Sequence, residues 1–177
     1  MAFKVLSMNW IKYIAIFGLI FLCSCHSGTT PDNLMKVRVR RVLSGQTIEV
    51  VFAKTSELAI VRLTGIDAPD LRQSPWGQQA KQRLTKLIVG MPIKLETETP
   101  ERDRYDRLNA HIWQNHTLIS QKLVQEGFVL ANTSSSPKYS KLLIDAQEYA
   151  RLMGYGIWNP KLAMRQTPNQ FRATIKK

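Results

Sequence analysis

Apolar and polar residues alternate along five short stretches of the chain, a pattern typical of strands that bury one face. These stretches are residues 36–43, 47–52, 58–66, 92–97 and 107–113. Short turns join the first three, so they predict an antiparallel meander. The segment before the fifth, from Glu98 to Asp106, is predicted to be a charged loop.

Three other stretches repeat apolar residues at the spacing of a helix, which predicts helices over 75–89, 118–126 and 137–153. Ser74 is the expected N-cap of the first helix, with Pro75 in its first turn. A helix between the third and fourth of five strands is the order of an OB-fold barrel. The expected fold is therefore a five-stranded OB-fold barrel, mainly β with α (α+β), with one inserted helix and two C-terminal helices.

The N-terminal residues have the pattern of a targeting segment. Lysines precede an apolar run at 13–22 that is too short for a comfortable membrane span. The sequence Leu22-Cys23-Ser24-Cys25 resembles a bacterial lipobox, which predicts cleavage of residues 1–24 and a lipid on Cys25. An uncleaved anchor or ordinary secretion is the alternative. In each case we expect an exported protein that faces the periplasm or the cell exterior.

Composition divides the remaining chain into a polar tether at 25–35, a folded domain at 36–159 and a basic tail at 160–177 that is predicted to be disordered. The formal net charge of +12 indicates a polyanionic partner, either nucleic acid or an anionic membrane. Both cysteines precede the folded domain, which excludes a disulfide or a Cys-ligated metal site within it. We expect a monomer.

The third predicted strand ends in a stiff acidic turn at 61–70. Alternation places Arg62 on the face opposite the apolar residues, and Pro69 restrains the backbone that carries Asp67 and Asp70. An inward arginine needs an anion, and rigid carboxylates suit a hard cation or a proton transfer. Taken alone, the same segment could be a surface turn whose carboxylates cap loops.

Together with several other motifs, this turn resembles the thermonuclease family, the staphylococcal-nuclease-like domains. The resemblance covers most of residues 37–158. Its motifs are Ser44-Gly45-Gln46-Thr47, the turn at 61–70, Pro75-Trp76-Gly77, Asp103-Arg104-Tyr105-Asp106-Arg107, Ala150-Arg151 and Gly156-Ile157-Trp158. Each motif is weak alone, but their order and spacing on a basic, exported domain are specific.

The resemblance implies metal-dependent hydrolysis of phosphodiester bonds in DNA or RNA. Arg62 and Arg107 would bind the phosphate and stabilise the charge of the transition state, and Tyr105 would contact the phosphate end of the substrate. Asp70 stands where the family has a glutamate that activates the attacking water. The carboxylate of an aspartate is one methylene shorter, which predicts a reduced rate.

The resemblance also implies a bound divalent cation, usually Ca²⁺, with Mg²⁺ or Mn²⁺ as alternatives. Its ligands would include the Asp67 carboxylate and the backbone carbonyl of Ala68. The family's second metal carboxylate is replaced by Gln46, which predicts weaker binding because calcium affinity depends on ligand charge. Asp106 replaces a family glycine beside Arg107; it could restore the lost charge or neutralise that arginine.

Two hypotheses of different classes follow. The first is an exported, membrane-tethered endonuclease with weakened metal binding and a reduced rate. The second is a catalytically silent OB-fold lipoprotein that binds nucleic acid. A third and weaker hypothesis is that the basic surface holds anionic lipid headgroups beside the lipid anchor.

Overall fold

The computed structural model describes residues 34–135 and 138–175. The predicted signal peptide, its cleavage site and the predicted lipid on Cys25 lie outside these residues. Across both described ranges, no helix is long and apolar enough to cross a membrane.

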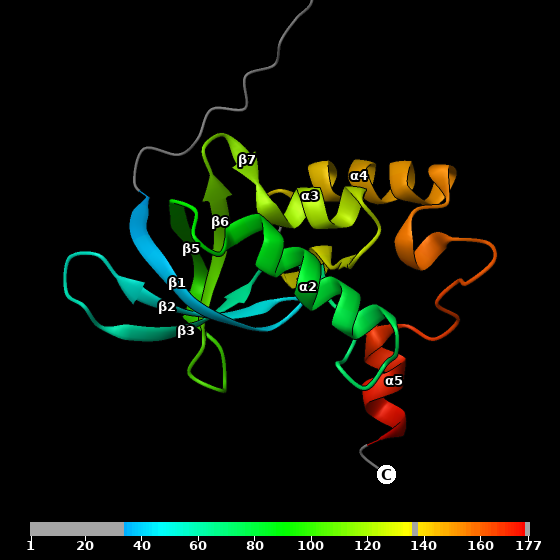
Figure 1. Cartoon of the computed structure of the whole chain (residues 1–177), viewed down its shortest axis with the longest axis horizontal. Helices are drawn as coiled ribbons and strands as arrows, with labels where there is room; N and C mark the ends of the chain where they lie inside the picture. The colour runs from blue at the N-terminus through cyan, green and yellow to red at the C-terminus, as the bar shows by residue number, and fades with distance from the viewer. Residues whose placement is uncertain (1–33, 136–137, 176–177) are drawn as a thin grey trace, which may run out of the picture.

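A closed barrel of five strands forms the body of the molecule (Figure 1). Its strands are β1 (Met35–Ser44), β2 (Thr47–Phe52), β3 (Leu58–Leu63), β5 (Ile93–Arg102) and β6 (Leu108–Gln114). The first three form the predicted antiparallel meander, β5 pairs with both β1 and β6, and a parallel pairing of β3 with β6 closes the barrel. The fold is therefore the expected α+β OB-fold.

Short strands and helices complete the domain. They are β4 (Ile66–Asp67), α2 (Trp76–Ile88), β7 (Thr117–Leu118), α3 (Ile119–Gln125), β8 (Leu130–Ala131), η1 (Thr133–Ser135), α4 (Ser140–Met153), η2 (Gly156–Trp158) and α5 (Pro168–Thr174). Helix α2 runs from the barrel toward α5, while α3 and α4 pack together (Figure 1). The pairing of β4 with β8 ties the acidic turn to the segment after α3.

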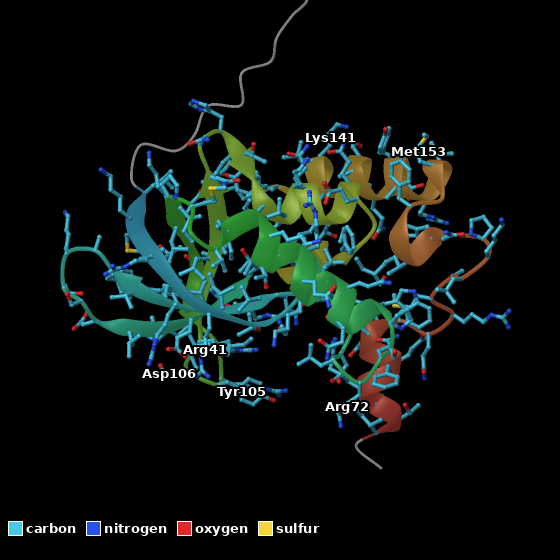
Figure 2. The ribbon with its side chains drawn as sticks, in the orientation of Figure 1. Arg41, Arg72, Tyr105, Asp106, Lys141 and Met153 are labelled. Carbon is cyan, nitrogen blue, oxygen red and sulfur yellow. The ribbon has the colours of Figure 1, made fainter. Side chains whose placement is uncertain are left out.

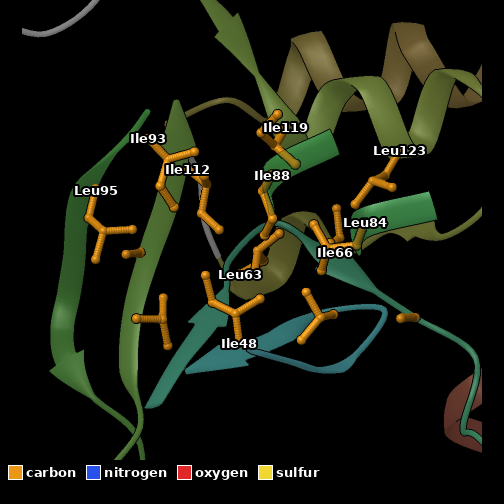
Figure 3. Packing of buried hydrophobic residues seen from close by; sticks show 14 of the residues in the cluster. Ile48, Leu63, Ile66, Leu84, Ile88, Ile93, Leu95, Ile112, Ile119 and Leu123 are labelled. Carbon is orange, nitrogen blue, oxygen red and sulfur yellow. The ribbon is translucent and has the colours of Figure 1, made fainter. Parts of the chain in front are cut away.

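The core lies between the barrel and α2 (Figure 3). Ile48 and Leu63 point inward from the meander and meet Leu84 and Ile88 of α2, and all four side chains are fully buried. Burial of an aliphatic side chain of this size contributes about 1.5–3 kcal/mol. The core therefore fixes β3 and α2 relative to each other, and both elements lead into the candidate site.

A buried carboxylate fastens the start of α4 to the barrel. Glu96 of β5 accepts hydrogen bonds from Trp113 Nε1 at 2.8 Å and from the Tyr139 hydroxyl at 2.9 Å, and it pairs with the Lys138 ammonium. Burial opposes ionisation of Glu96, but these donors outweigh it and lower the pKa of the carboxyl. The carboxylate thus remains charged inside the domain.

Several boundaries differ from the prediction: the third strand ends at Leu63 and not at residue 66, and the longest helix begins at Ser140 and not at residue 137. The charged segment predicted as a loop is mostly strand: β5 continues to Arg102, which pairs with Leu108 of β6, and only residues 103–107 turn. Exposed polar side chains concealed this strand because both of its faces near the end are solvated. The first helix begins at Trp76 with Pro75, and not Ser74, as its N-cap residue, and Pro75 makes no side-chain capping hydrogen bond.

The prediction of a disordered tail at 160–177 is wrong for residues 168–174, which form helix α5. Thr167 and Gln170 make a reciprocal capping box, in which each side chain accepts a hydrogen bond from the other's backbone N–H. Pro168 begins the helix and is buried. Gln73 also donates a 2.6 Å hydrogen bond to the carbonyl of Gln166. These local caps and contacts stabilise a segment whose composition is typical of disorder.

Candidate active site

The β1–β2 hairpin, the acidic turn, the β5–β6 turn and α5 meet around two hollows. One, of about 450 Å³, is lined by Gln46, Ala68, Asp70 and Arg107, among others. The second, of about 340 Å³, is lined by Arg62 and Asp67 together with residues of β8 and the following segment. Arg172 of α5 lines both hollows. The fold thus gathers most of the predicted site residues around one arginine from the tail.

Two glycines hold the acidic turn in place. A Cβ atom on Gly45 would lie 2.7 Å from the Cβ of Ala80 and 3.0 Å from that of Ala68, so the hairpin turn can pack there only without a side chain. A Cβ atom on Gly77 would lie 2.0 Å from the carbonyl oxygen of Asp70. The hairpin and the start of α2 therefore clamp the backbone of residues 68–70.

Arg62 projects from β3 into the site and is half-buried. Burial lowers the pKa of its guanidinium, as does the nearby Arg107, whereas Asp67 and Asp103 raise it. An arginine nevertheless stays charged in a protein. Within the described residues the Arg62 side chain forms no hydrogen bond. Its guanidinium, which points into the site, therefore remains available to an external anion.

Arg107 is oriented by a carboxylate from its own turn. Asp103 accepts the Nε–H of Arg107 at 2.8 Å and its backbone N–H at 3.1 Å. Burial raises the pKa of Asp103, but these hydrogen bonds outweigh it and the net pKa is lowered. The Arg107 guanidinium also lies 5.2 Å from the ring centre of Tyr105, a residue that is 61% exposed (Figure 2). Tyr105 thus stands at the open edge of the site.

Asp106 takes neither of the roles that the sequence left open. It lies at the tip of the β5–β6 turn (Figure 2), and its side chain is 86% exposed. Its carboxylate contacts Arg102 at 3.3 Å and reaches neither Arg107 nor Asp67. Its φ of 59° is left-handed, which explains why a glycine suits this position in the family resemblance.

The predicted metal ligands are already occupied by donors of the protein. Both carboxylate oxygens of Asp67 accept hydrogen bonds from Arg172 Nη2, at 2.7 and 2.9 Å. The carbonyl of Ala68 faces Arg172 Nη1 at 3.5 Å. The amide oxygen of Gln46 accepts the backbone N–H of Ala68 at 2.7 Å. Each of these oxygens therefore already faces a donor of the protein, with which a cation would have to compete.

This arrangement does not fit a calcium ion. Ca²⁺ takes about 6–8 oxygen ligands, with carboxylates among them. No group of three or more His, Cys, Asp or Glu side chains within 34–135 and 138–175 could hold a metal ion. The carboxylate at the predicted position, that of Asp67, instead pairs with a guanidinium.

Asp70 is also paired. It accepts the backbone N–H of Arg72 at 3.0 Å and two guanidinium N–H groups at 2.9 and 3.1 Å. Hydrogen bonding from Arg72 lowers the pKa of Asp70, and burial opposes this only in part. Figure 2 shows Arg72 beside α5. The carboxylate is therefore present at the predicted base position but is a weaker base than a free aspartate.

Comparison with known proteins agrees with the fold and with the family resemblance of the sequence motifs. Residues 60–160 match the family described as staphylococcal nuclease homologue. The chain belongs to the staphylococcal nuclease family. A thermonuclease of Staphylococcus intermedius is 30% identical over 159 residues, which cover 84% of this chain and 94% of the relative. A thermonuclease of Staphylococcus hyicus is 27% identical over 75% of this chain and 81% of its own length. Endonuclease YncB of Bacillus subtilis is 27% identical over 72% of this chain and 63% of its own length.

In this member of the staphylococcal nuclease family, the site includes three residues that sequence reasoning missed. Asp103 orients Arg107, Arg72 holds Asp70, and Arg172 holds Asp67. Asp103 and Arg72 each lie within four residues of their partner, so local spacing could have revealed them. Arg172 lies 105 positions from Asp67, and only the capping box around it gave a signal.

Proposed function

We propose that this chain is a nuclease that hydrolyses phosphodiester bonds in DNA or RNA, with endonuclease cleavage as the expected mode. The observation that carries the proposal is Arg62, an inward, half-buried guanidinium without a hydrogen-bond partner among the described residues, close to Arg107. Two guanidiniums form a cradle for one phosphate. The names of the relatives, thermonuclease and endonuclease, support the same chemistry.

The reaction would be an in-line displacement at phosphorus. A water oxygen forms the new P–O bond and Asp70 accepts its proton, while the bond to the leaving oxygen breaks and that oxygen takes up a proton from solvent. Negative charge develops on the equatorial oxygens, where Arg62 and Arg107 donate hydrogen bonds. Because the Asp70 carboxylate is held by Arg72 and its pKa is lowered, proton transfer to it is weakly driven and a slow rate is expected.

The family resemblance implies Ca²⁺, with Mg²⁺ or Mn²⁺ as alternatives, but the oxygens that would bind it are engaged. A cation would have to displace Arg172 from Asp67 and compete with the Ala68 N–H for Gln46. We therefore expect weak metal binding.

Export and membrane tethering through a lipid on Cys25 are also part of the proposal. Their support is the charged, apolar and lipobox-like pattern of residues 1–25. We further propose that the folded domain acts as a monomer on nucleic acid outside the cytoplasm. Metabolic labelling with a radioactive fatty acid tests the lipid anchor, because Cys25→Ser should abolish the label.

A cleavage assay tests the nuclease proposal. Plasmid DNA and a structured RNA are incubated with the full chain in EDTA, Ca²⁺, Mg²⁺ or Mn²⁺, at pH values up to about 9–10 to favour a weak base. Arg62→Ala and Arg107→Ala should each reduce cleavage by about 10²–10³-fold, the usual effect of losing one donor to a developing charge. Arg38→Ala, which removes an exposed arginine on β1, is the matched control and should cleave normally.

A second candidate is the silent nucleic-acid-binding lipoprotein. The engagement of Asp70 by Arg72 and of Asp67 by Arg172 favours it, because both carboxylates that chemistry would use are neutralised. Binding of nucleic acid with no cleavage under any of these conditions would select it over the nuclease.

A further inference from the structure

The guanidinium of Arg172 occupies the position that the family resemblance assigns to a metal ion. It bridges the carboxylate of Asp67 and the carbonyl of Ala68, the two expected ligands. We propose that this guanidinium replaces the divalent cation, so that a metal-free cluster of Arg62, Arg107 and Arg172 binds the phosphate. The inference rests on the proposed function, since it concerns how the same site holds a phosphodiester.

The charges of the site agree with a guanidinium and disagree with a dication. Where the family resemblance expects a second metal carboxylate, this chain has the neutral Gln46, whose oxygen turns to the backbone N–H of Ala68. One negative charge is thereby removed from the ligand set. The remaining single carboxylate, Asp67, matches the single charge of Arg172. Loss of the carboxylate and gain of the arginine therefore compensate each other.

The same guanidinium retains donors for a substrate. Of its five N–H groups, Asp67 and Ala68 engage three, on Nη1 and Nη2. The Nε–H and one Nη1–H remain. Arg172 lines the hollow that contains Arg107 and the hollow that contains Arg62, so it stands between the two predicted phosphate ligands.

The cluster also has the right net charge for its ligand. Three arginines stand against two carboxylates, because Asp67 pairs with Arg172, Asp103 pairs with Arg107, and Arg62 has no such pair in the part of the chain that the structure describes. The surplus of one positive charge equals the charge of one phosphodiester group. Bidentate donation by planar guanidiniums suits phosphate oxygens.

Helix α5 is built to hold this arginine. The capping box of Thr167 and Gln170 fixes its first turn, and Pro168 is buried against the domain. The hydrogen bond from Gln73 to the carbonyl of Gln166 anchors the chain just before the helix. Arg172 therefore reaches Asp67 from a defined backbone position.

The test measures binding, not cleavage. A 5′-phosphorylated deoxydinucleotide is titrated into the full chain by calorimetry in EDTA, and then in Ca²⁺. The wild type should bind in EDTA, and Ca²⁺ should not strengthen binding. Arg172→Ala should weaken binding in EDTA by about tenfold or more, which corresponds to about 1.4 kcal/mol. Arg165→Ala, an exposed arginine of the same segment, is the control and should bind like the wild type.

A second variant tests the exchange of charges directly. Gln46→Asp combined with Arg172→Ala restores two carboxylates and removes the guanidinium. This protein should bind Ca²⁺ in a calorimetric titration where the wild type does not, and its dinucleotide affinity should become calcium-dependent. Arg172→Lys, which keeps the charge but loses the planar fork, should bind more weakly than the wild type and serves if Arg172→Ala does not fold.

Two results would overturn the inference: dinucleotide binding by Arg172→Ala in EDTA that equals or exceeds the wild type, or Ca²⁺ that strengthens wild-type binding about tenfold. The first would mean that α5 only blocks the site. The nuclease proposal fails separately: dinucleotide binding that depends on Arg172, without cleavage in any variant, would refute cleavage alone. Cleavage that requires Ca²⁺ and increases in Arg172→Ala would refute only the proposal that the Arg172 guanidinium replaces the cation, and would leave the nuclease proposal intact.

Discussion

Removal of the Arg72 side chain should release the proposed general base. In the structure, Asp70 accepts two hydrogen bonds from the Arg72 guanidinium and one from its backbone N–H. Arg72→Ala removes the first two and keeps the third. The pKa of Asp70, lowered chiefly by these side-chain bonds, should therefore rise toward that of an ordinary aspartate.

The size of the effect is limited by solvent. The Arg72 side chain is 65% exposed, and exposed pairs contribute about 0–1 kcal/mol because water screens them. Since 1.36 kcal/mol corresponds to a tenfold change, the maximal rate of cleavage should rise by up to about fivefold. A stronger base becomes protonated at a higher pH, so the acid limb of the pH–rate profile should shift to higher pH.

Two measurements check this. Carbon-detected NMR of the Asp70 carboxyl reports its titration without any catalysis, and initial rates of DNA cleavage across pH report the limb and the plateau. Arg165→Ala, a nearby exposed arginine, is the matched control and should change neither. An unchanged Asp70 titration would refute the electrostatic argument. A raised pKa with a large loss of activity would instead mean that Arg72 contacts the substrate.

Three further changes have predicted outcomes. Asp106→Gly should stabilise the protein by about 0.5–1 kcal/mol in urea unfolding and leave cleavage unchanged, because it relieves a left-handed backbone at an exposed position outside the site; a loss of activity would contradict the placement. Gly77→Ala should cost about 1–3 kcal/mol and reduce cleavage, because its Cβ atom would displace the carbonyl of Asp70; unchanged unfolding would refute the clamp. Glu96→Gln should cost about 1–3 kcal/mol at neutral pH. Because the folded-state pKa of Glu96 is lowered, the stability it provides is present above its unfolded pKa and is lost as pH falls through the folded one, so urea unfolding of the variant should show less acid dependence than the wild type.

Sequence periodicity predicted the barrel because the buried face of each strand is fixed by local alternation. Ile48 and Leu63, for example, point inward as their patterns require. It failed at the end of β5, where solvent covers both faces and the signal disappears. It also failed at α5, a helix of seven residues whose apolar face is too short to register a period.

The candidate site likewise has a part that the sequence predicts and a part that it does not. Arg62, Asp67 and Asp70 were predictable because they share one rigid turn, and a family motif supplied Arg107. What each carboxylate pairs with was not predictable, since Asp67 meets its partner 105 positions away. Pattern analysis thus named residues that the fold brings together in the candidate site, whereas the ion pairs that they form could be seen only in the folded chain.

The connection to α5 has a consequence for how this protein would be inactivated. Seven exposed residues lie between η2 and α5 and belong to no strand or α-helix: Asn159, Pro160, Lys161, Leu162, Ala163, Arg165 and Thr167. A protease that cuts there removes Arg172 from Asp67 without breaking any barrel strand. Phosphate affinity and thermal stability should then decrease at different rates during limited digestion. A cleaved molecule should stay folded after its site has lost the Arg172 guanidinium.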